Sequence, residues 1–336
     1  MKEIRKEARE RMKGFCRVCP VCNGVACAGE VPGMGGIGTG SAFTANGKAL
    51  AKWRLNMRLL HDVTDPQTGI DFLGKPLRLP FLAAPIGGVS FNMGGAISEQ
   101  AYIEAVLSGC AAAGTLGCVG DGVPDFIHES GYAAIKALGG AGIPFIKPWE
   151  EDELEQKIEK ALAAGADTIG MDVDAAGLVT LKMMGRPVTP KSPQTLSRMI
   201  QKLPAKLILK GIMTADDARI AVDVGAHAIV VSNHGGRVLD HTPGVAEVLP
   251  EIAAAVKGRI TLVADGGVRS GADVLKLLAL GADAVMIGRP VSVAAVGGLQ
   301  EGVLKYLKQI ESELIAAMVL TGTPNVTAVD ATILRG

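Results

Sequence analysis

A histidine and an arginine follow a short apolar run in the segment AIVVSNHGGRVLD, residues 228–240. The small and β-branched residues of that run predict a strand buried on both faces, with His234 and Arg237 just beyond its C-terminal end. An imidazole exchanges a proton near neutral pH, and a planar guanidinium holds a carboxylate through two parallel hydrogen bonds. The two glycines between these side chains let the backbone turn sharply and leave room for a flat ligand. A base beside a carboxylate clamp indicates a small acid as the substrate.

The segment SNHGGRVLD resembles the active-site signature of the FMN-dependent α-hydroxy-acid oxidase and dehydrogenase family. That family includes glycolate oxidase, lactate oxidase and flavocytochrome lactate dehydrogenase. The resemblance implies that FMN is the cofactor, that His234 is the base and that Arg237 binds the substrate carboxylate. The alternative is a loop histidine without a catalytic role, although histidine is a common general base.

The same resemblance implies a set of flavin ligands at the ends of the predicted strands. Lys210 matches the lysine that the family places beside flavin N1 and the C2 carbonyl, where a cation stabilises a reduced flavin. Residues 265–269 and 288–289 match the family's phosphate loops, in which backbone amides, a helix N-terminus and a basic side chain hold the phosphate. The complete expected set is Pro85, Ile86, Gly87, Lys147, Asp172, Lys210, Ser232, His234, Arg237, Asp265, Gly267, Arg269, Gly288 and Arg289.

The expected substrate pocket departs from the family pattern. Lys147 and Trp149 stand where family members usually carry a glutamine and a tyrosine. The first tyrosine is Tyr102, whereas other family members have a substrate-contacting tyrosine near the glycine-rich loop 29–41. Trp149 and Arg186 are therefore candidate substrate ligands, and Lys147 is a candidate second positive charge. Specificity for glycolate or lactate does not carry over.

Eight short apolar runs alternate with helical stretches from residue 80 onward, which predicts parallel strands joined by helices. Eight strand–helix units predict an α/β protein with the TIM (β/α)8 barrel fold, whose active site lies at the C-terminal ends of the strands. A doubly wound open sheet is the alternative, because periodicity alone does not show closure. We expect the barrel to span residues 75–336 and residues 1–74 to form a Cys- and Gly-rich N-terminal extension. The expected strands lie near residues 80–85, 115–120, 144–149, 168–174, 207–212, 228–233, 261–267 and 284–290.

Four cysteines occur close together in FCRVCPVCNGVAC, namely Cys16, Cys19, Cys22 and Cys27. Their CxxCxxCxxxxC spacing, in a chain expected to stay in a reducing compartment, favours metal or iron–sulfur ligation over disulfides. The pattern approaches a ferredoxin-type run, but its last interval is longer and no proline follows. An iron–sulfur cluster, a zinc site, a redox-active thiol pair and a set of reduced, packed thiols all fit this pattern.

Composition argues against nucleic-acid and membrane partners. Lysine plus arginine and aspartate plus glutamate each number 34, so no overall field favours a polyanion, and 4% aromatics offer few surfaces for base stacking. The N-terminal MKEIRKEARERMKGF lacks an apolar run, which predicts a solvated helix and a cytoplasmic protein without a signal peptide or membrane span. The family resemblance implies a homo-oligomer, specifically a tetramer.

These features together predict an FMN-dependent oxidoreductase that converts a 2-hydroxy acid to a 2-oxo acid. The sequence leaves open the carbanion and hydride routes, the identity of the acid, and the acceptor, which is oxygen, a quinone, an electron-transfer protein or an iron–sulfur centre in the cysteine segment. One alternative is an FMN-dependent isomerase resembling type 2 isopentenyl diphosphate isomerase, a family that does not use the histidine–arginine pair of SNHGGR. A non-catalytic metal or iron–sulfur scaffold is the other.

Overall fold

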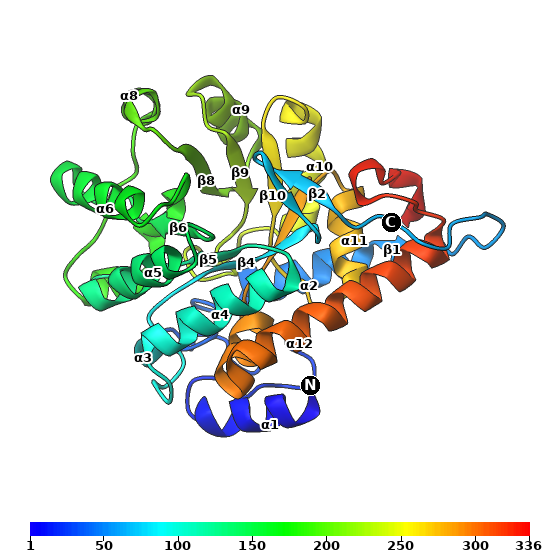
Figure 1. The fold of residues 1–336 in the computed structure, drawn as a ribbon, viewed down its shortest axis with the longest axis horizontal. Coiled ribbons are helices and arrows are strands. Elements are labelled where there is room, and N and C mark those ends of the chain that lie inside the picture. The colour runs from blue at the N-terminus through cyan, green and yellow to red at the C-terminus, as the bar shows by residue number, and fades with distance from the viewer.

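A closed barrel of eight parallel strands forms the body of the protein. The computed structural model describes all residues, 1–336, and the strands follow the order β10-β11-β4-β5-β6-β7-β8-β9 around the barrel (Figure 1). Every strand overlaps one of the expected apolar runs, so the predicted TIM barrel is confirmed and the open-sheet alternative is wrong. The barrel strands are β4 (Phe81–Ile86), β5 (Gly117–Val119), β6 (Ile143–Ile146), β7 (Thr168–Asp172), β8 (Lys206–Ile212), β9 (Ala228–Val231), β10 (Thr261–Ala264) and β11 (Ala284–Ile287).

Helices surround the barrel, and several begin at a side-chain cap. Ser98, Ser192, Thr214 and Ser270 each accept a hydrogen bond from a backbone N–H of the first helical turn, which satisfies a donor that the helix cannot pair. The outer helices are α4 (Glu99–Ala113), α5 (Asp125–Ala137), α6 (Glu151–Ala163), α8 (Pro193–Lys202), α9 (Ala215–Asp223), α10 (Val245–Val256), α11 (Gly271–Ala279) and α12 (Arg289–Thr321). None of these helices combines the length and the apolar composition needed to cross a bilayer.

Short elements follow two of the strands on the C-terminal side of the barrel. They are α3 (Val89–Asn92) after β4, and η1 (Val173–Gly177) and α7 (Val179–Met183) after β7. The chain ends with the 3-10 turns η2 (Val326–Ala328) and η3 (Ala331–Ile333). These pieces shape the rim at which the active site of a TIM barrel is expected.

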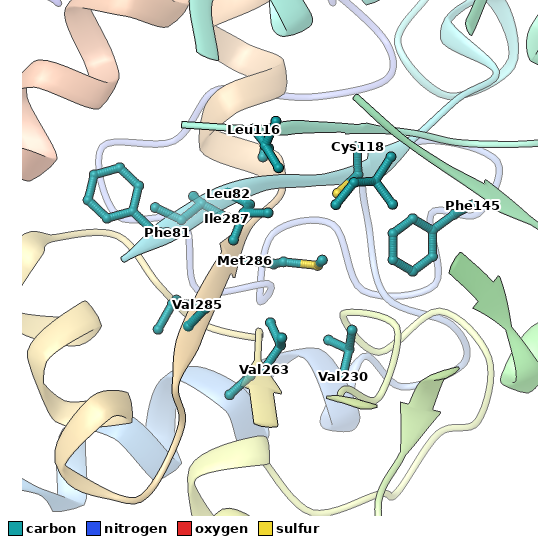
Figure 2. Close-up of a cluster of buried hydrophobic side chains, with 14 of the residues drawn as sticks. Phe81, Leu82, Leu116, Cys118, Phe145, Val230, Val263, Val285, Met286 and Ile287 are labelled. Carbon is teal, nitrogen blue, oxygen red and sulfur yellow. The ribbon is translucent and has the colours of Figure 1, made fainter. Parts of the chain in front are cut away.

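Apolar side chains fill the barrel interior. Val230, Val263 and Met286 come from three different strands and are at most 1% exposed. Figure 2 shows them gathered with Phe145 in the space that the strands enclose. A filled interior leaves no passage along the barrel axis, so a ligand has to bind at the rim.

The N-terminal helix α1 (Lys2–Arg11) packs across α12 (Figure 1). A Cβ at Gly297 would lie 2.1 Å from the Ile4 carbonyl oxygen, so this close approach requires glycine. Ala8 is fully buried, while Glu7 and Arg11 form an ion pair of 2.7 Å and Arg11 also donates to the Val296 carbonyl of α12. The predicted helix is confirmed, but it is solvated on one side only, because its other face packs against the core.

The chain then runs through an irregular arm, residues 12–40, into α2 (Ser41–Lys52). Two small antiparallel pairs follow, formed by β1 (Arg54–Leu55) with the C-terminal β12 (Leu334–Arg335) and by β2 (Ile70–Phe72) with β3 (Lys75–Leu77). The second pair crosses the expected boundary between the extension and the barrel. The division at residue 75 therefore stays a prediction.

Candidate active site

A cavity opens at the C-terminal rim, and all eight barrel strands or the loops after them contribute to its wall. Met34 of the arm and residues of α3 complete the lining. Every residue expected at the flavin lines this cavity except Ser232, which lies behind it. The expected residues that meet here are Pro85, Ile86, Gly87, Lys147, Asp172, Lys210, His234, Arg237, Asp265, Gly267, Arg269, Gly288 and Arg289.

The loop after β9 holds its backbone in an unusual conformation. His234, Gly235 and Gly236 have φ angles of 54°, 63° and 78°, so three successive residues occupy the left-handed region. A Cβ at Gly236 would lie 2.3 Å from the Phe43 nitrogen at the start of α2, and one at Gly235 would lie 2.5 Å from the Arg289 guanidinium. Glycine at both positions thus allows α2 and Arg289 to approach, which leaves His234 facing the cavity.

His234 receives a carboxylate partner that the sequence did not reveal. Its Nδ1 lies 3.0 and 3.1 Å from the two oxygens of Asp174, in η1, and its Nε2 has no hydrogen-bond partner within the protein. A partner at Nδ1 leaves Nε2 as the atom that takes a proton from a ligand. The only sequence signal was a second aspartate in TIGMDVD, because a strand pattern does not predict the 3-10 turn that aims Asp174 at the loop.

Two buried lysines flank Asp172 at the end of β7. Lys210 Nζ lies 3.3 Å and Lys147 Nζ lies 3.8 Å from its carboxylate, and Lys210 Nζ also lies 3.4 Å from His234 Nδ1. Burial alone would raise the pKa of Asp172, but Lys210, His234 and Lys147 lower it to about 2. Asp172 is therefore a carboxylate at neutral pH, and it offsets part of the positive charge of Lys210 and Lys147. The remaining positive charge would stabilise negative charge on a bound ring system.

Arg237 binds the protein only through neutral oxygen atoms. Its guanidinium donates to the Gly33 carbonyl at 2.5 Å, to the Gly35 carbonyl at 3.2 Å and to Asn92 Oδ1 at 2.8 Å. Burial lowers the pKa of Arg237 to about 10, which still leaves a cation at neutral pH. A buried cation without a counter-charge is costly, so an anionic ligand would stabilise this site.

The other two arginines of the rim also lack a carboxylate partner. Arg289 donates to the carbonyls of Met34, Gly35 and Gly235, and its guanidinium lies 3.8 Å from the centre of the Phe43 ring. Arg269 donates to the Cys22 carbonyl at 3.2 Å and forms no ion pair. Burial, and then the like charges of Arg237 and Arg269, lower the pKa of Arg289 to about 9. Three converging arginines suit two anionic groups, such as the phosphate of one ligand and the carboxylate of another.

The residues at the flavin position fit FMN on a further observation. Asp265 Oδ1 is buried without a hydrogen-bond partner, while its Oδ2 accepts a bond of 2.8 Å from the Ser232 hydroxyl. A buried carboxylate oxygen without a partner is costly, and a ribityl hydroxyl is a donor that would satisfy it. Ser232 Oγ also accepts from the His234 backbone N–H at 3.1 Å. Ser232 therefore positions Asp265 and His234 rather than contacting the cavity.

The structure does not bring Trp149 and Arg186 to the cavity. Trp149 is 2% exposed, and its indole N–H donates to Asp121 Oδ2 at 2.6 Å. Lys157 lies over the indole at 4.6 Å, and Arg186 lies over it at 5.4 Å while pairing with Glu153. The expectation that Trp149 and Arg186 bind substrate is therefore wrong, because the polar network around Asp121 uses both side chains.

An apolar wall forms another part of the lining. It comes from the loops after β4 and β7 and from the arm. Sequence reasoning missed this wall, because apolar residues in irregular loops carry no periodic signal. Its members are Met34, Phe91, Leu178, Leu181 and Met184.

Comparison with known proteins decides what this cavity belongs to. The profile of the family described as FMN-dependent dehydrogenase matches residues 33–182 and 180–336. The chain belongs to this family. The predictions of an FMN cofactor and of a 2-hydroxy-acid oxidase or dehydrogenase are thereby confirmed. The match begins after the cysteines of the arm, which lie outside the family pattern.

Relatives within the family support the same assignment. An L-lactate oxidase of Nostoc sp. is 31% identical over 347 aligned residues, which cover 90% of this chain and 92% of that protein. A 4-hydroxymandelate oxidase of Amycolatopsis orientalis is 32% identical and covers 88% of this chain and 90% of its own length. The crystal structure of mandelate oxidase with (S)-4-hydroxymandelic acid matches with a TM-score of 0.81 and 29% identity, covering 99% of this chain and 97% of that one.

Proposed function

We propose that the protein oxidises a 2-hydroxy acid carrying an apolar side chain, with His234 as the base and Arg237 as the carboxylate ligand. One observation carries the proposal: the free Nε2 of His234 and the guanidinium of Arg237, which has no carboxylate partner, belong to the same cavity. The two electrons of the oxidation go to FMN, which supplies the redox chemistry when it is bound.

His234 takes a proton from the substrate at Nε2, from either the α-carbon or the hydroxyl group. The carboxylate of Asp174 holds the ring through Nδ1 and stabilises the imidazolium that results. Arg237 fixes the substrate carboxylate through parallel hydrogen bonds, which aligns the α-carbon with the base. His234 and Arg237 thus hold the base and the substrate in a fixed arrangement during the proton transfer.

Separate parts of the rim hold the cofactor. Arg269 and Arg289 would bind its phosphate with the help of the backbone around Gly267, and Asp265 would accept from its ribityl chain. Lys210, and Lys147 on the other side of Asp172, would stabilise the negative charge of the reduced ring.

The apolar wall supports the choice of substrate class. Leu178, Leu181 and Met184 offer no hydrogen-bond donor or charge to a polar substrate tail, so an aliphatic or aromatic side chain fits best. Two relatives are named for lactate and 4-hydroxymandelate, whose side chains are a methyl group and a largely apolar hydroxyphenyl ring. Glycolate, which has no side chain, would gain nothing from this wall.

Anaerobic titration of the flavin absorbance with a panel of 2-hydroxy acids tests the proposal. We expect an acid with an apolar side chain to bleach the flavin, and His234→Ala to abolish the bleaching. His241→Ala is the matched control, because that histidine lies on the same loop but is 74% exposed. A bound flavin that no 2-hydroxy acid bleaches would contradict the proposal and favour the isomerase, which turns over without net electron transfer. The scaffold alternative predicts no bound flavin, or a bound flavin that no 2-hydroxy acid reduces.

The electron acceptor, the homo-oligomeric state and the cytoplasmic location stay predictions. Steady-state assays with oxygen, a quinone and a one-electron acceptor protein would identify the acceptor. Sedimentation of the purified protein would test the tetramer.

A further inference from the structure

The four cysteines of the arm lie against the rim of the active-site cavity. Arg269, which lines that cavity, donates to the Cys22 carbonyl at 3.2 Å and to Cys22 Sγ at 3.4 Å. The Cys27 carbonyl lies against Gly35, whose own carbonyl accepts from Arg289 at 3.2 Å. The cysteine segment, which precedes the residues matched by the family, therefore contacts the proposed phosphate-binding loops directly.

An ion pair closes the cysteine segment into a loop. Both guanidinium nitrogens of Arg17 donate to the Glu30 carboxylate, at 2.5 and 2.6 Å, and the Glu30 N–H donates to the Cys27 carbonyl at 3.2 Å. This contact brings the residue after Cys16 next to the turn that follows Cys27. The Arg17–Glu30 ion pair thus holds the two ends of the cysteine run together.

The four thiols of this loop form no disulfide, and all of them are half-buried. The Phe15 carbonyl, next to Cys16, accepts from the Met34 N–H at 3.1 Å, and the Glu30 carbonyl accepts from the Gly35 N–H at 3.2 Å. Both ends of the cysteine run therefore pack against residues 34–35. The fold therefore keeps these four cysteines as free thiols.

The spacing of the sulfur atoms argues against a site for a single ion. Zinc bound by four thiolates holds them on a tetrahedron with Zn–S bonds of about 2.3 Å, which puts the sulfurs about 3.8 Å apart. No three of these sulfurs lie within 4.8 Å of one another. A polynuclear cluster holds its thiolates further apart than one ion does. Three cysteines at successive two-residue gaps also match the start of a ferredoxin-type run.

The surroundings of the loop are cationic. Arg5 donates to the Cys19 carbonyl at 2.5 Å, and Arg9 donates to the Val18 carbonyl at 3.0 Å. Neither of these arginines, nor Arg269, forms an ion pair, and the carboxylate of Glu30 is already engaged by Arg17. The positive charge left over suits a group with a net negative charge.

We propose that Cys16, Cys19, Cys22 and Cys27 bind one [4Fe–4S] cluster beside the flavin cavity. Each thiol loses its proton on binding, and four thiolates around a core of charge 2+ give a net charge of 2−. The neighbouring arginines offset this charge, and the contact between Arg269 and Cys22 sets the cluster against the phosphate end of the cavity. The inference is independent of which acid the enzyme oxidises.

Metal analysis of the full-length protein, purified without oxygen, tests the proposal. We expect about four iron atoms and four acid-labile sulfides per chain, together with an electron paramagnetic resonance signal after reduction with dithionite. Cys19→Ser and Cys22→Ser should each lose iron and sulfide while keeping bound FMN, which reports a folded barrel. Cys110→Ala, which changes a thiol buried in α4, should keep the iron, the sulfide and the FMN.

Several results would overturn the cluster. One is about one zinc per chain in place of iron. Another is the absence of iron and sulfide after anaerobic reconstitution with ferrous iron and sulfide. Retention of full iron in both serine variants would remove the cysteines as ligands. The wild-type stoichiometry decides the question even if a variant fails to fold, and flavin bleaching by a 2-hydroxy acid reports separately on the proposed function.

Discussion

His234 Nδ1 lies 3.0 Å from Asp174 Oδ1, although the two residues are sixty positions apart in the sequence. The imidazole comes from a left-handed loop after β9 and the carboxylate from a 3-10 turn after β7. A carboxylate in this position fixes the ring and the tautomer and stabilises the protonated form. The pair thus fixes the orientation of the His234 ring and leaves its Nε2 without a partner in the protein.

Asp174→Asn should lower the rate of flavin reduction about 100-fold or more, because a neutral amide does not stabilise the imidazolium. Anaerobic stopped-flow absorbance with a saturating substrate measures this rate. Asp216→Asn is the control, since that aspartate is on the surface and its side chain is 88% exposed. Equal rates in the two variants would mean that Asp174 has no part in proton transfer.

Arg237→Lys should raise KM about 100-fold, which corresponds to about 2.8 kcal/mol, because an ammonium group cannot form two parallel hydrogen bonds to a carboxylate. Initial rates over a range of substrate concentrations measure the change. Arg219→Lys, a change in a surface pair of α9, should leave KM unaltered. An unchanged KM in Arg237→Lys would show that the substrate carboxylate binds elsewhere.

Lys157→Met should destabilise the protein by about 3 to 5 kcal/mol, because it leaves the buried carboxylate of Asp121 without the ammonium group that lies 2.6 Å away. Urea unfolding measures the loss. Lys160→Met on the same helix removes an exposed pair with Glu129 and should cost about 1 kcal/mol or less. A similar cost for both variants would refute the buried pair as a source of stability.

Asp240 should make stability depend on pH in the acid range. Hydrogen bonds from Ser41 and Thr39 hold the pKa of this carboxyl below its ordinary value. A lowered folded-state pKa gives stability that is complete above the unfolded pKa, about 3.9, and is lost as the pH falls toward the folded value. Thermal unfolding between about pH 5 and pH 2 should therefore show a shallower pH dependence in Asp240→Asn than in wild type.

The matched control for this pH profile is Asp62→Asn, since Asp62 is exposed. Asp240→Asn should also cost about 1 to 3 kcal/mol at neutral pH, because the carboxylate joins the loop of His234 to the start of α2. Parallel pH profiles for wild type and Asp240→Asn would contradict this assignment.

Periodicity predicted the barrel because each strand is a short buried run between turn signals. The same pattern brought Lys210 and His234 to the cavity as expected, since Lys210 lies near the end of β8, His234 follows the end of β9, and all parallel strands end at one rim. Trp149 also lies near a strand end, but its indole N–H is bound to the buried Asp121 and the side chain does not line the cavity. A sequence pattern predicts that a residue lies at the end of a strand. Whether its side chain points into the cavity depends on contacts with residues far along the chain.

Asp174 and the contacts of the arm illustrate what no local pattern could supply. Arg237 was expected to be free for a carboxylate, yet carbonyls two hundred residues earlier accept its hydrogen bonds. Those carbonyls belong to a glycine-rich stretch with no helical or strand period. Only the folded chain reveals that the arm and the loop after β9 meet.

The carbonyls of Gly33, Met34 and Gly35 bind Arg237 and Arg289, two residues that also line the cavity. The arm is thus fastened across the mouth by the same side chains that would hold the ligands. We therefore expect FMN insertion and the docking of residues 33–35 to be linked, so that a chain whose arm is undocked exchanges its cofactor faster.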